Sequence, residues 1–109
     1  MTDKRIVLTT ASSEEEAEKI AQHLVERRLA ACVNLVPRIR SIYRWREKVE
    51  SSQEWLLIIK TSADRYPEVR DAIRVLHSYQ LPECIVLGIE DGSDAYLEWL
   101  GDSVSSQES

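Results

Sequence analysis

Hydrophobic and polar positions follow two different periods along the chain, and each period predicts one kind of element. The apolar run at 5–10 predicts a short buried strand. Residues 13–29 carry apolar side chains three and four positions apart, which predicts an amphipathic helix. Ser13, with Glu16 three positions later, forms a capping-box pattern, so we expect the helix to begin there.

A period of two dominates the middle of the chain. Residues 38–49 place basic side chains at even positions and mostly apolar ones at odd positions, which predicts a long strand with one charged and one apolar face. A shorter strand at 31–36 precedes it and is interrupted by Pro37. Residues 50–53 predict a turn and 54–61 a third strand, so the second and third strands form a hairpin.

The remaining third of the chain predicts one strand between two helices. Pro67 suits the first turn of a second helix, which ends near His77. The apolar run at 84–89 predicts a fourth strand, and Ser93 or Asp94 can cap a short last helix. The order βαββαβ with a C-terminal helix predicts an α+β, ferredoxin-like split βαβ fold with a four-stranded antiparallel sheet and two helices on one face.

We expect a single domain over residues 1–101 and a polar, flexible tail over 102–109. The predicted strand at 38–49 is longer than a typical strand of about 5–6 residues. Its apolar face carries Tyr43 and Trp45, and a ribbon that extends past its own sheet would leave that face in water. Because such patches mark interfaces, the sequence predicts a closed homo-oligomer.

The formal net charge of the 109 residues is −5, and residues 75–109 hold seven acidic residues and no Lys or Arg. An acidic chain lacks the basic footprint that nonspecific nucleic-acid binding needs. The alternating Arg residues of the long strand allow contact with RNA or phosphate, but a solvated or edge-protecting strand face is the favoured interpretation. We therefore expect no nucleic-acid partner.

The apolar segments are too short for a membrane span of about 20 residues. The stretch after the N-terminus is also too short for the apolar region of a signal peptide. These patterns predict no membrane partner and a cytoplasmic protein, or else a mature chain from which a targeting segment has been removed.

The common motifs of nucleotide enzymes, serine hydrolases and zinc proteases are missing from the sequence. His77 has three interpretations: it complements the end of a helix, it binds a metal ion, or it transfers protons in a pocket with Tyr79 and Glu83. Because no nucleophile–base pair is visible, we expect the protein not to be an enzyme.

Cys32 and Cys84 lie 52 residues apart without the spacing of a zinc site. Cys32 is either an inert thiol buried in the core or a soft ligand that suits copper. Cys84 is expected in the core. Lys60, at the end of the third strand, either binds an anion or lies on the surface.

Several separated segments together resemble the CutA divalent-cation-tolerance family, from about residue 6 to 100. The matching segments are Leu24-Val25-Glu26, Leu29-Ala30-Ala31-Cys32-Val33-Asn34 with Pro37, Ser41-Ile42-Tyr43-Arg44-Trp45, Glu54 and Leu57 with Lys60-Thr61, His77-Ser78-Tyr79-Gln80 with Pro82-Glu83, and Gly92 with Tyr96, Leu97, Trp99 and Leu100.

The resemblance implies a homotrimer whose ribbons interlock around a three-fold axis, similar to the PII signalling proteins. It implies a role in the response to metal ions, with copper or another divalent cation bound between subunits. The metal-ligand candidates that it marks are Cys32, His77 and Glu83. The residues expected to line the inter-subunit clefts are Tyr43, Trp45, Glu54, Lys60 and Tyr79.

Two departures from the family pattern concern the expected clefts. Ser78 stands where the motif has proline, and Glu47 stands where a glycine is usual, so a positive φ at Glu47 is placed in doubt. An alternative function is a PII-like signalling trimer that senses a small metabolite and has no physiological role with metals.

Overall fold

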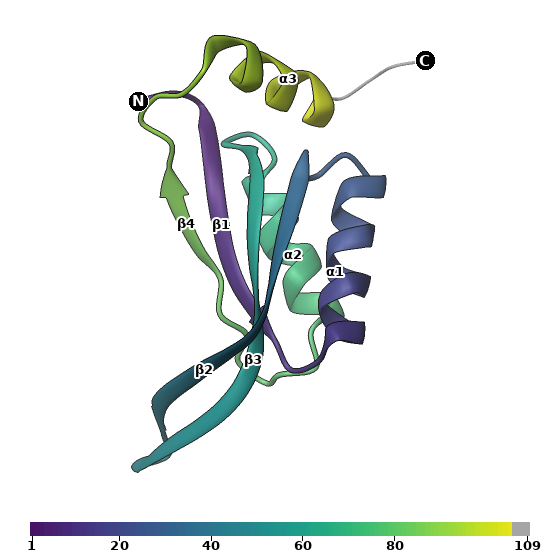
Figure 1. Ribbon diagram of the computed structural model, residues 1–109. Coiled ribbons are helices and arrows are strands. Elements are labelled where there is room, and N and C mark those ends of the chain that lie inside the picture. The colour runs from purple at the N-terminus through teal and green to yellow at the C-terminus, as the bar shows by residue number, and fades with distance from the viewer. Residues whose placement is uncertain (106–109) are drawn as a thin grey trace.

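The computed structural model describes residues 1–105, which form a four-stranded antiparallel sheet and three helices (Figure 1). The strand order is β2-β3-β1-β4. This arrangement confirms the predicted α+β fold with its βαββαβ order and C-terminal helix. The elements are β1 (Lys4–Ala11), α1 (Glu14–Glu26), β2 (Cys32–Trp45), β3 (Lys48–Ser62), α2 (Tyr66–Leu76), β4 (Ile85–Gly88) and α3 (Asp94–Val104).

The first helix begins where the capping signal predicts and ends earlier than expected. The hydroxyl of Ser13 accepts a hydrogen bond from the backbone N–H of Glu16 at 3.1 Å. The predicted end at residue 29 is wrong because Arg28 adopts a positive φ of 60°. The N–H of Leu29 then reaches back to the carbonyl of Leu24 at 2.9 Å, which closes the helix in a Schellman motif.

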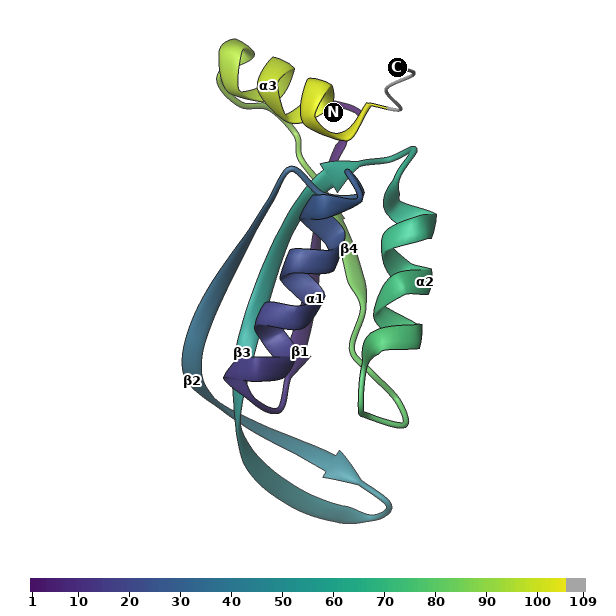
Figure 2. The same cartoon turned by 90° about the vertical axis from the view of Figure 1, so that its right-hand side faces the viewer.

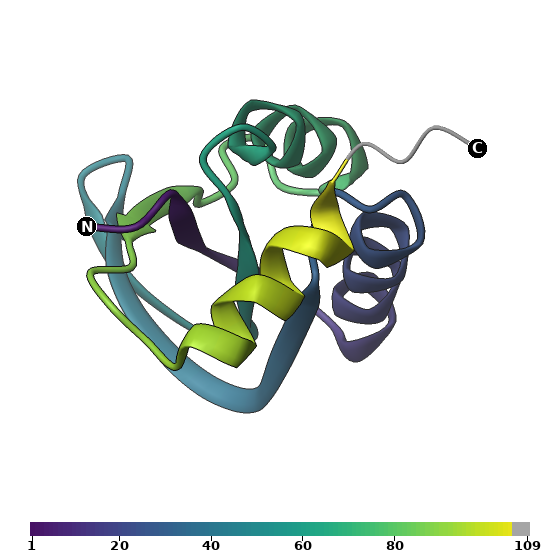
Figure 3. The same cartoon turned by 90° about the horizontal axis from the view of Figure 1, so that it is seen from above.

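Helices α1 and α2 cover the same face of the sheet (Figure 2), and the core lies between them and the strands. Alternate residues of β1 and β3 point into this core, together with the apolar stripes of both helices. Helix α3 lies across one end of the sheet (Figure 3). The fully buried residues include Val7, Ile20, Leu24, Leu57, Ile59, Val69 and Ile73.

Pro37 does not end the second strand, which continues to Trp45 through a β-bulge. The bulge lies between Val36 and Ile39, where two residues of β2 oppose one residue of β3, and Arg38 takes a φ of 56°. An extra residue shifts the side-chain alternation by one, so Tyr43 and Trp45 lie on the same sheet face as Val36.

The hairpin turns at Arg46 and Glu47, not at residues 50–53 as expected. Residues 50–53 pair with β2 inside β3. Arg46 and Glu47 have φ values of 51° and 72°, the pattern of a two-residue type I′ turn. The structure therefore keeps a positive φ at Glu47 although glycine is absent. The distal part of the hairpin, residues 39–54, is called the ribbon below, and it extends past the rest of the sheet (Figure 1).

The C-terminal elements differ slightly from their expected bounds. Strand β4 covers fewer residues than the predicted 84–89 and lies at the edge of the sheet. The hydroxyl of Ser93 caps α3 by accepting from the N–H of Tyr96 at 3.4 Å. Helix α3 runs to Val104, whose exposed fraction is 3%, three residues past the expected domain end at residue 101. The rest of the expected tail, 106–109, lies outside the described residues.

The sheet face opposite the helices, called the open face, is largely apolar. Its residues follow from the strand register, because cross-strand partners share a face. On β4, Ile85 and Leu87 are about half exposed, with exposed fractions of 48% and 46%. The apolar members of the open face are Ile6, Leu8, Val36, Leu56, Ile58, Ile85 and Leu87.

Candidate functional site

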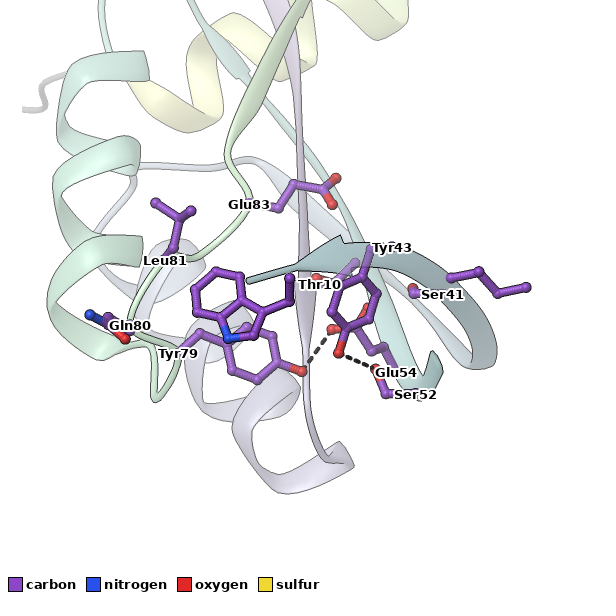
Figure 4. Close-up of a pocket in the computed structure, with 11 residues that line it drawn as sticks. Thr10, Ser41, Tyr43, Ser52, Glu54, Tyr79, Gln80, Leu81 and Glu83 are labelled. Atoms are coloured by element: carbon purple, nitrogen blue, oxygen red, sulfur yellow. Dashed lines mark hydrogen bonds between the residues drawn. The ribbon is translucent and has the colours of Figure 1, made fainter. Parts of the chain in front are cut away.

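A pocket of about 740 Å³ lies where the ribbon faces the end of β1 and the loop between α2 and β4 (Figure 4). The bulge in β2 matters here because it turns the odd-numbered side chains of the ribbon toward this loop. The pocket is lined by Thr10, Ser41, Ile42, Tyr43, Trp45, Ser52, Glu54, Tyr79, Gln80, Leu81 and Glu83.

Glu54 is the buried carboxylate of the pocket, with an exposed fraction of 6%. Its Oε2 accepts a 2.7 Å hydrogen bond from the hydroxyl of Tyr79. Its other oxygen has no hydrogen-bond partner among the described residues. This oxygen is not fully buried, because the buried side-chain polar atom without a partner among the described residues is Thr9 Oγ1. It is therefore free to accept from a positively charged or N–H-bearing ligand in the pocket.

The two neighbours of Glu54 both hold their protons more tightly than usual. Burial raises the pKa of the Tyr79 hydroxyl above its ordinary range, and the hydrogen bond to Glu54 raises it further. Tyr79 is therefore a neutral donor at physiological pH. Burial also raises the pKa of the Glu83 carboxyl, with the charge of Glu54 as the second cause. The two carboxylates thus lie close enough to interact.

His77 caps the end of α2 and is buried behind the pocket instead of lining it. Its Nε2 donates to the carbonyl oxygen of Thr10 at 2.5 Å, and its Nδ1 accepts from the N–H of Tyr79 at 3.1 Å. A carbonyl only accepts, so these partners assign a neutral ring protonated on Nε2. Both nitrogens are occupied, and neither is free to bind a metal ion.

Ser78 continues this anchoring through its backbone. Its N–H donates to Oε2 of Glu16 at 2.7 Å, which joins the loop to the first turn of α1. Proline at this position would have no N–H to donate. The departure from the family motif at Ser78 therefore supplies a hydrogen bond that helps to position Tyr79.

Cys32 lies far from His77. Cys32 begins β2 opposite Lys60, which pairs with Ile6 of β1, whereas His77 contacts Thr10, four residues further along β1. At about 3.3 Å per residue, this separation amounts to roughly 13 Å along the strands. Within residues 1–105, no group of three or more His, Cys, Asp or Glu side chains is placed to hold a metal ion.

Five of the expected site residues line the pocket together: Tyr43, Trp45, Glu54, Tyr79 and Glu83. Lys60 does not, because its ammonium group donates to the side-chain carbonyl of Asn34 elsewhere on the open face. Sequence reasoning missed Thr10, Ser41, Ile42, Ser52, Gln80 and Leu81. Ser41 and Ser52 were detectable in principle, because they share a strand face with Tyr43 and Glu54.

Known sequences of one protein family match nearly the whole chain. A family model described as CutA1 divalent ion tolerance protein matches residues 5–103. The divalent-cation tolerance protein CutA of Thermus thermophilus is 47% identical over 97 residues, which cover 89% of this chain and 94% of that protein. The chloroplastic CutA protein of Arabidopsis thaliana is 45% identical over 98 residues, which cover 90% of this chain and 54% of that protein.

Solved structures share the fold. One of them, described as the periplasmic divalent cation tolerance protein CutA from Archaeoglobus fulgidus, has a TM-score of 0.91 at 40% identity. The match covers 94% of this chain and 99% of that chain. Within residues 1–105, none of the helices has the length and apolar character needed to cross a membrane.

Proposed function

The chain belongs to the CutA1 divalent ion tolerance protein family, and we propose that it acts in the response to divalent metal ions as a homotrimer with cation-binding clefts between its subunits. The observation that carries this proposal is the pair of carboxylates, Glu54 and Glu83, facing one pocket. Carboxylate oxygens are preferred ligands of divalent cations.

The homotrimer is supported by the surface that one chain leaves uncovered. The apolar open face is continuous with the pocket side of the ribbon, and Ile85 and Leu87 lie on it at the sheet edge. A second copy covering this face would remove apolar area from water at about 25 cal/mol per Å². It would also bring further ligands to the pocket, because two carboxylates do not complete the coordination of a divalent cation.

Copper held by Cys32 and His77 of the same chain does not fit the geometry. The two side chains lie at opposite ends of the sheet, and both ring nitrogens of His77 are occupied. Copper binding at Cys32 therefore needs ligands from another subunit. The donor set of the pocket, made of carboxylate and hydroxyl oxygens, suits harder divalent cations such as Mn²⁺.

Titration calorimetry with Mn²⁺ and with Cu²⁺ tests the assignment. We expect Glu83→Gln, alone or with Glu54→Gln, to weaken Mn²⁺ binding at least tenfold, whereas Cys32→Ser leaves it unchanged. Glu90→Gln is the matched control, because Glu90 is an exposed acid outside the pocket. Equal Mn²⁺ affinity in wild type and Glu83→Gln would show that the pocket does not bind the cation. Loss of Cu²⁺ binding in Cys32→Ser alone would identify Cys32 as a copper ligand.

The charge of the pocket limits which metabolites a PII-like sensing protein could bind there. Among the described residues, two glutamates and no Lys or Arg line it, so a phosphate-bearing metabolite has no counter-charge there. A neutral or cationic metabolite remains compatible with a sensing trimer. A thermal-shift screen that finds stabilisation by such a metabolite and no response to metal ions would favour this alternative.

A cytoplasmic location and a non-enzymatic role stay predictions. The names of the relatives describe tolerance to divalent cations and state no reaction. Two of the relatives have names that place them in chloroplasts and in the periplasm, which says nothing of a cytoplasmic location for this chain.

A further inference from the structure

The pocket offers more than oxygen ligands. Tyr43 and Tyr79 present aromatic rings to it, and Leu81 adds aliphatic surface (Figure 4). Trp45 lines the same pocket. A hydrated inorganic cation gains little from aliphatic walls, since it keeps its water. An organic cation uses both features, because its charge interacts with ring faces and its carbon chain is removed from water.

The polar groups of the pocket select for a positively charged donor. Glu54 is buried, and one of its carboxylate oxygens lacks a donor among the described residues. The side chains of Glu83, Ser41 and Thr10 place further oxygen atoms in the same lining. An ammonium group has three N–H donors and no acceptor, so these oxygens match it, and the two carboxylates repel an anion.

The ring of Trp45 already contacts an organic cation of its own chain. The guanidinium of Arg46 lies 5.4 Å from the ring centroid, and its NH2 group donates to Oε1 of Gln80 at 3.5 Å. Arg46 contacts two lining residues in this way but does not line the pocket itself. Trp45 keeps an exposed fraction of 37%, so part of its side chain stays accessible to a ligand.

We propose that this pocket binds the protonated amino group of a small aliphatic amine. The ammonium group lies between the free oxygen of Glu54 and the rings of Tyr43 and Trp45, and the aliphatic chain lies along Leu81. The site is the cleft of the proposed function, but amine binding does not depend on a metal ion. Amine and divalent cation would compete, because both use Glu54.

Calorimetric titration of the assembled protein with n-pentylamine and n-pentanol tests the proposal. The two probes share an alkyl chain and differ in charge at neutral pH. We expect n-pentylamine to bind at least tenfold more tightly than n-pentanol. This comparison uses wild-type protein only, so it does not depend on how a variant folds. Equal affinity for the two probes would overturn the proposal.

Two variants separate the amine from the metal ion. Trp45→Leu removes an aromatic face without a change of charge, so it should weaken n-pentylamine at least fivefold and weaken it more than it weakens Mn²⁺. Trp99→Leu is the control, because Trp99 is half exposed on α3 and outside the pocket. Glu54→Gln should weaken both ligands. Light scattering establishes that each variant keeps the assembly of the wild type.

The outcomes distinguish this proposal from the proposed function. Binding of n-pentylamine without binding of Mn²⁺ refutes the cation site and supports the amine site. Binding of Mn²⁺ without n-pentylamine does the reverse. Amine affinity that Trp45→Leu and Trp99→Leu change equally would also overturn the amine site, since the aromatic wall would then contribute nothing specific.

Discussion

Nε2 of His77 donates a 2.5 Å hydrogen bond to the carbonyl oxygen of Thr10, which joins the end of α2 to the end of β1. The opposite ring nitrogen accepts from the N–H of Tyr79, whose hydroxyl in turn binds Glu54. A histidine that the sequence offered as a helix cap, metal ligand or proton donor is thus a structural residue. It positions Tyr79 at the pocket.

The first prediction concerns this role of His77. Replacing His77 by Ala leaves the carbonyl of Thr10 and the N–H of Tyr79 without partners and opens a cavity, so we expect a loss of about 2–4 kcal/mol of unfolding free energy. Urea unfolding at fixed protein concentration measures this loss of unfolding free energy. His23→Ala, on the partly exposed side of α1, should change stability by less than about 0.5 kcal/mol. Wild-type stability in His77→Ala would contradict the assignment.

The second prediction is a pH dependence that arises at Glu16. Burial raises the pKa of this carboxyl, but hydrogen bonds from Ser78 and Ser12 outweigh burial and leave the pKa below its ordinary value of 4.5. Because its pKa is lowered in the folded state, the ionised carboxylate stabilises the protein fully above pH 4.5. This contribution is lost as the pH falls through the folded-state pKa.

Melting temperatures over an acidic to neutral pH series test this linkage. The stability difference between wild type and Glu16→Gln should be constant near neutral pH and should shrink in acid. Glu15→Gln, an exposed neighbour on the same helical turn, is the control and should follow the wild-type curve. Parallel curves for wild type and Glu16→Gln would show that the carboxylate at Ser78 contributes no pH-dependent stability.

The sequence predicted most helices and strands because the residues that determine them lie close together in the sequence. Ser13 caps α1 through Glu16, only three positions away, and both helices have clear apolar stripes. The hairpin turn was misplaced because Ser51 and Ser52 have turn composition, whereas Arg46 and Glu47 lack the Gly or Asn that marks a type I′ turn. The bulge at Arg38 was not predicted either, because Arg38 has a positive φ without being Gly or Asn.

The pocket could be predicted only as a set of residues, through the family resemblance, and not as a geometry. The role of His77 depends on Thr10, which is 67 positions away in sequence, so no local pattern reveals it. Cys32 and His77 looked compatible as copper ligands by chemistry alone. Their separation depends on long-range strand pairing, which no local sequence pattern shows directly.

The third prediction concerns the strained hairpin turn. A non-glycine residue in the left-handed region costs about 1–2 kcal/mol, and Glu47 has a φ of 72°. Glycine removes that cost but is more flexible when unfolded, so Glu47→Gly should stabilise the protein by about 0.5–1 kcal/mol. Glu50→Gly, at an extended position of the same ribbon, should destabilise it. Denaturant unfolding of both variants measures the change in the free energy of unfolding. A loss of stability in Glu47→Gly would argue against strain at this turn.

The fourth prediction separates two exposed aliphatic side chains. Leu87 on the open face and Val75 on α2 have exposed fractions of 46% and 79%. If copies of the chain meet through the open face, Leu87→Glu buries a charge in the interface and should dissociate the proposed trimer. Val75→Glu should leave the assembly intact. Light scattering measures the mass against the 12.5 kDa of one chain, and a wild-type mass for Leu87→Glu would exclude this face as the interface.

The fifth prediction links protons to cation binding at Glu83. Burial raises the pKa of the Glu83 carboxyl, and the charge of Glu54 adds to the shift, so the group keeps its proton at a higher pH than an ordinary glutamate. A divalent cation must displace this proton, because a ligating carboxylate is ionised. Below the folded-state pKa, the affinity should therefore fall by up to about tenfold per pH unit.

Calorimetric titration of Mn²⁺ across a pH series, in wild type and in two variants, measures this coupling. Glu83→Gln removes the titrating group, so its affinity should depend on pH less steeply than that of the wild type. Glu90→Gln removes an exposed acid outside the pocket and should keep the wild-type slope. If Glu83→Gln keeps that slope as well, the displaced proton comes from another group, and Glu83 does not bind the cation.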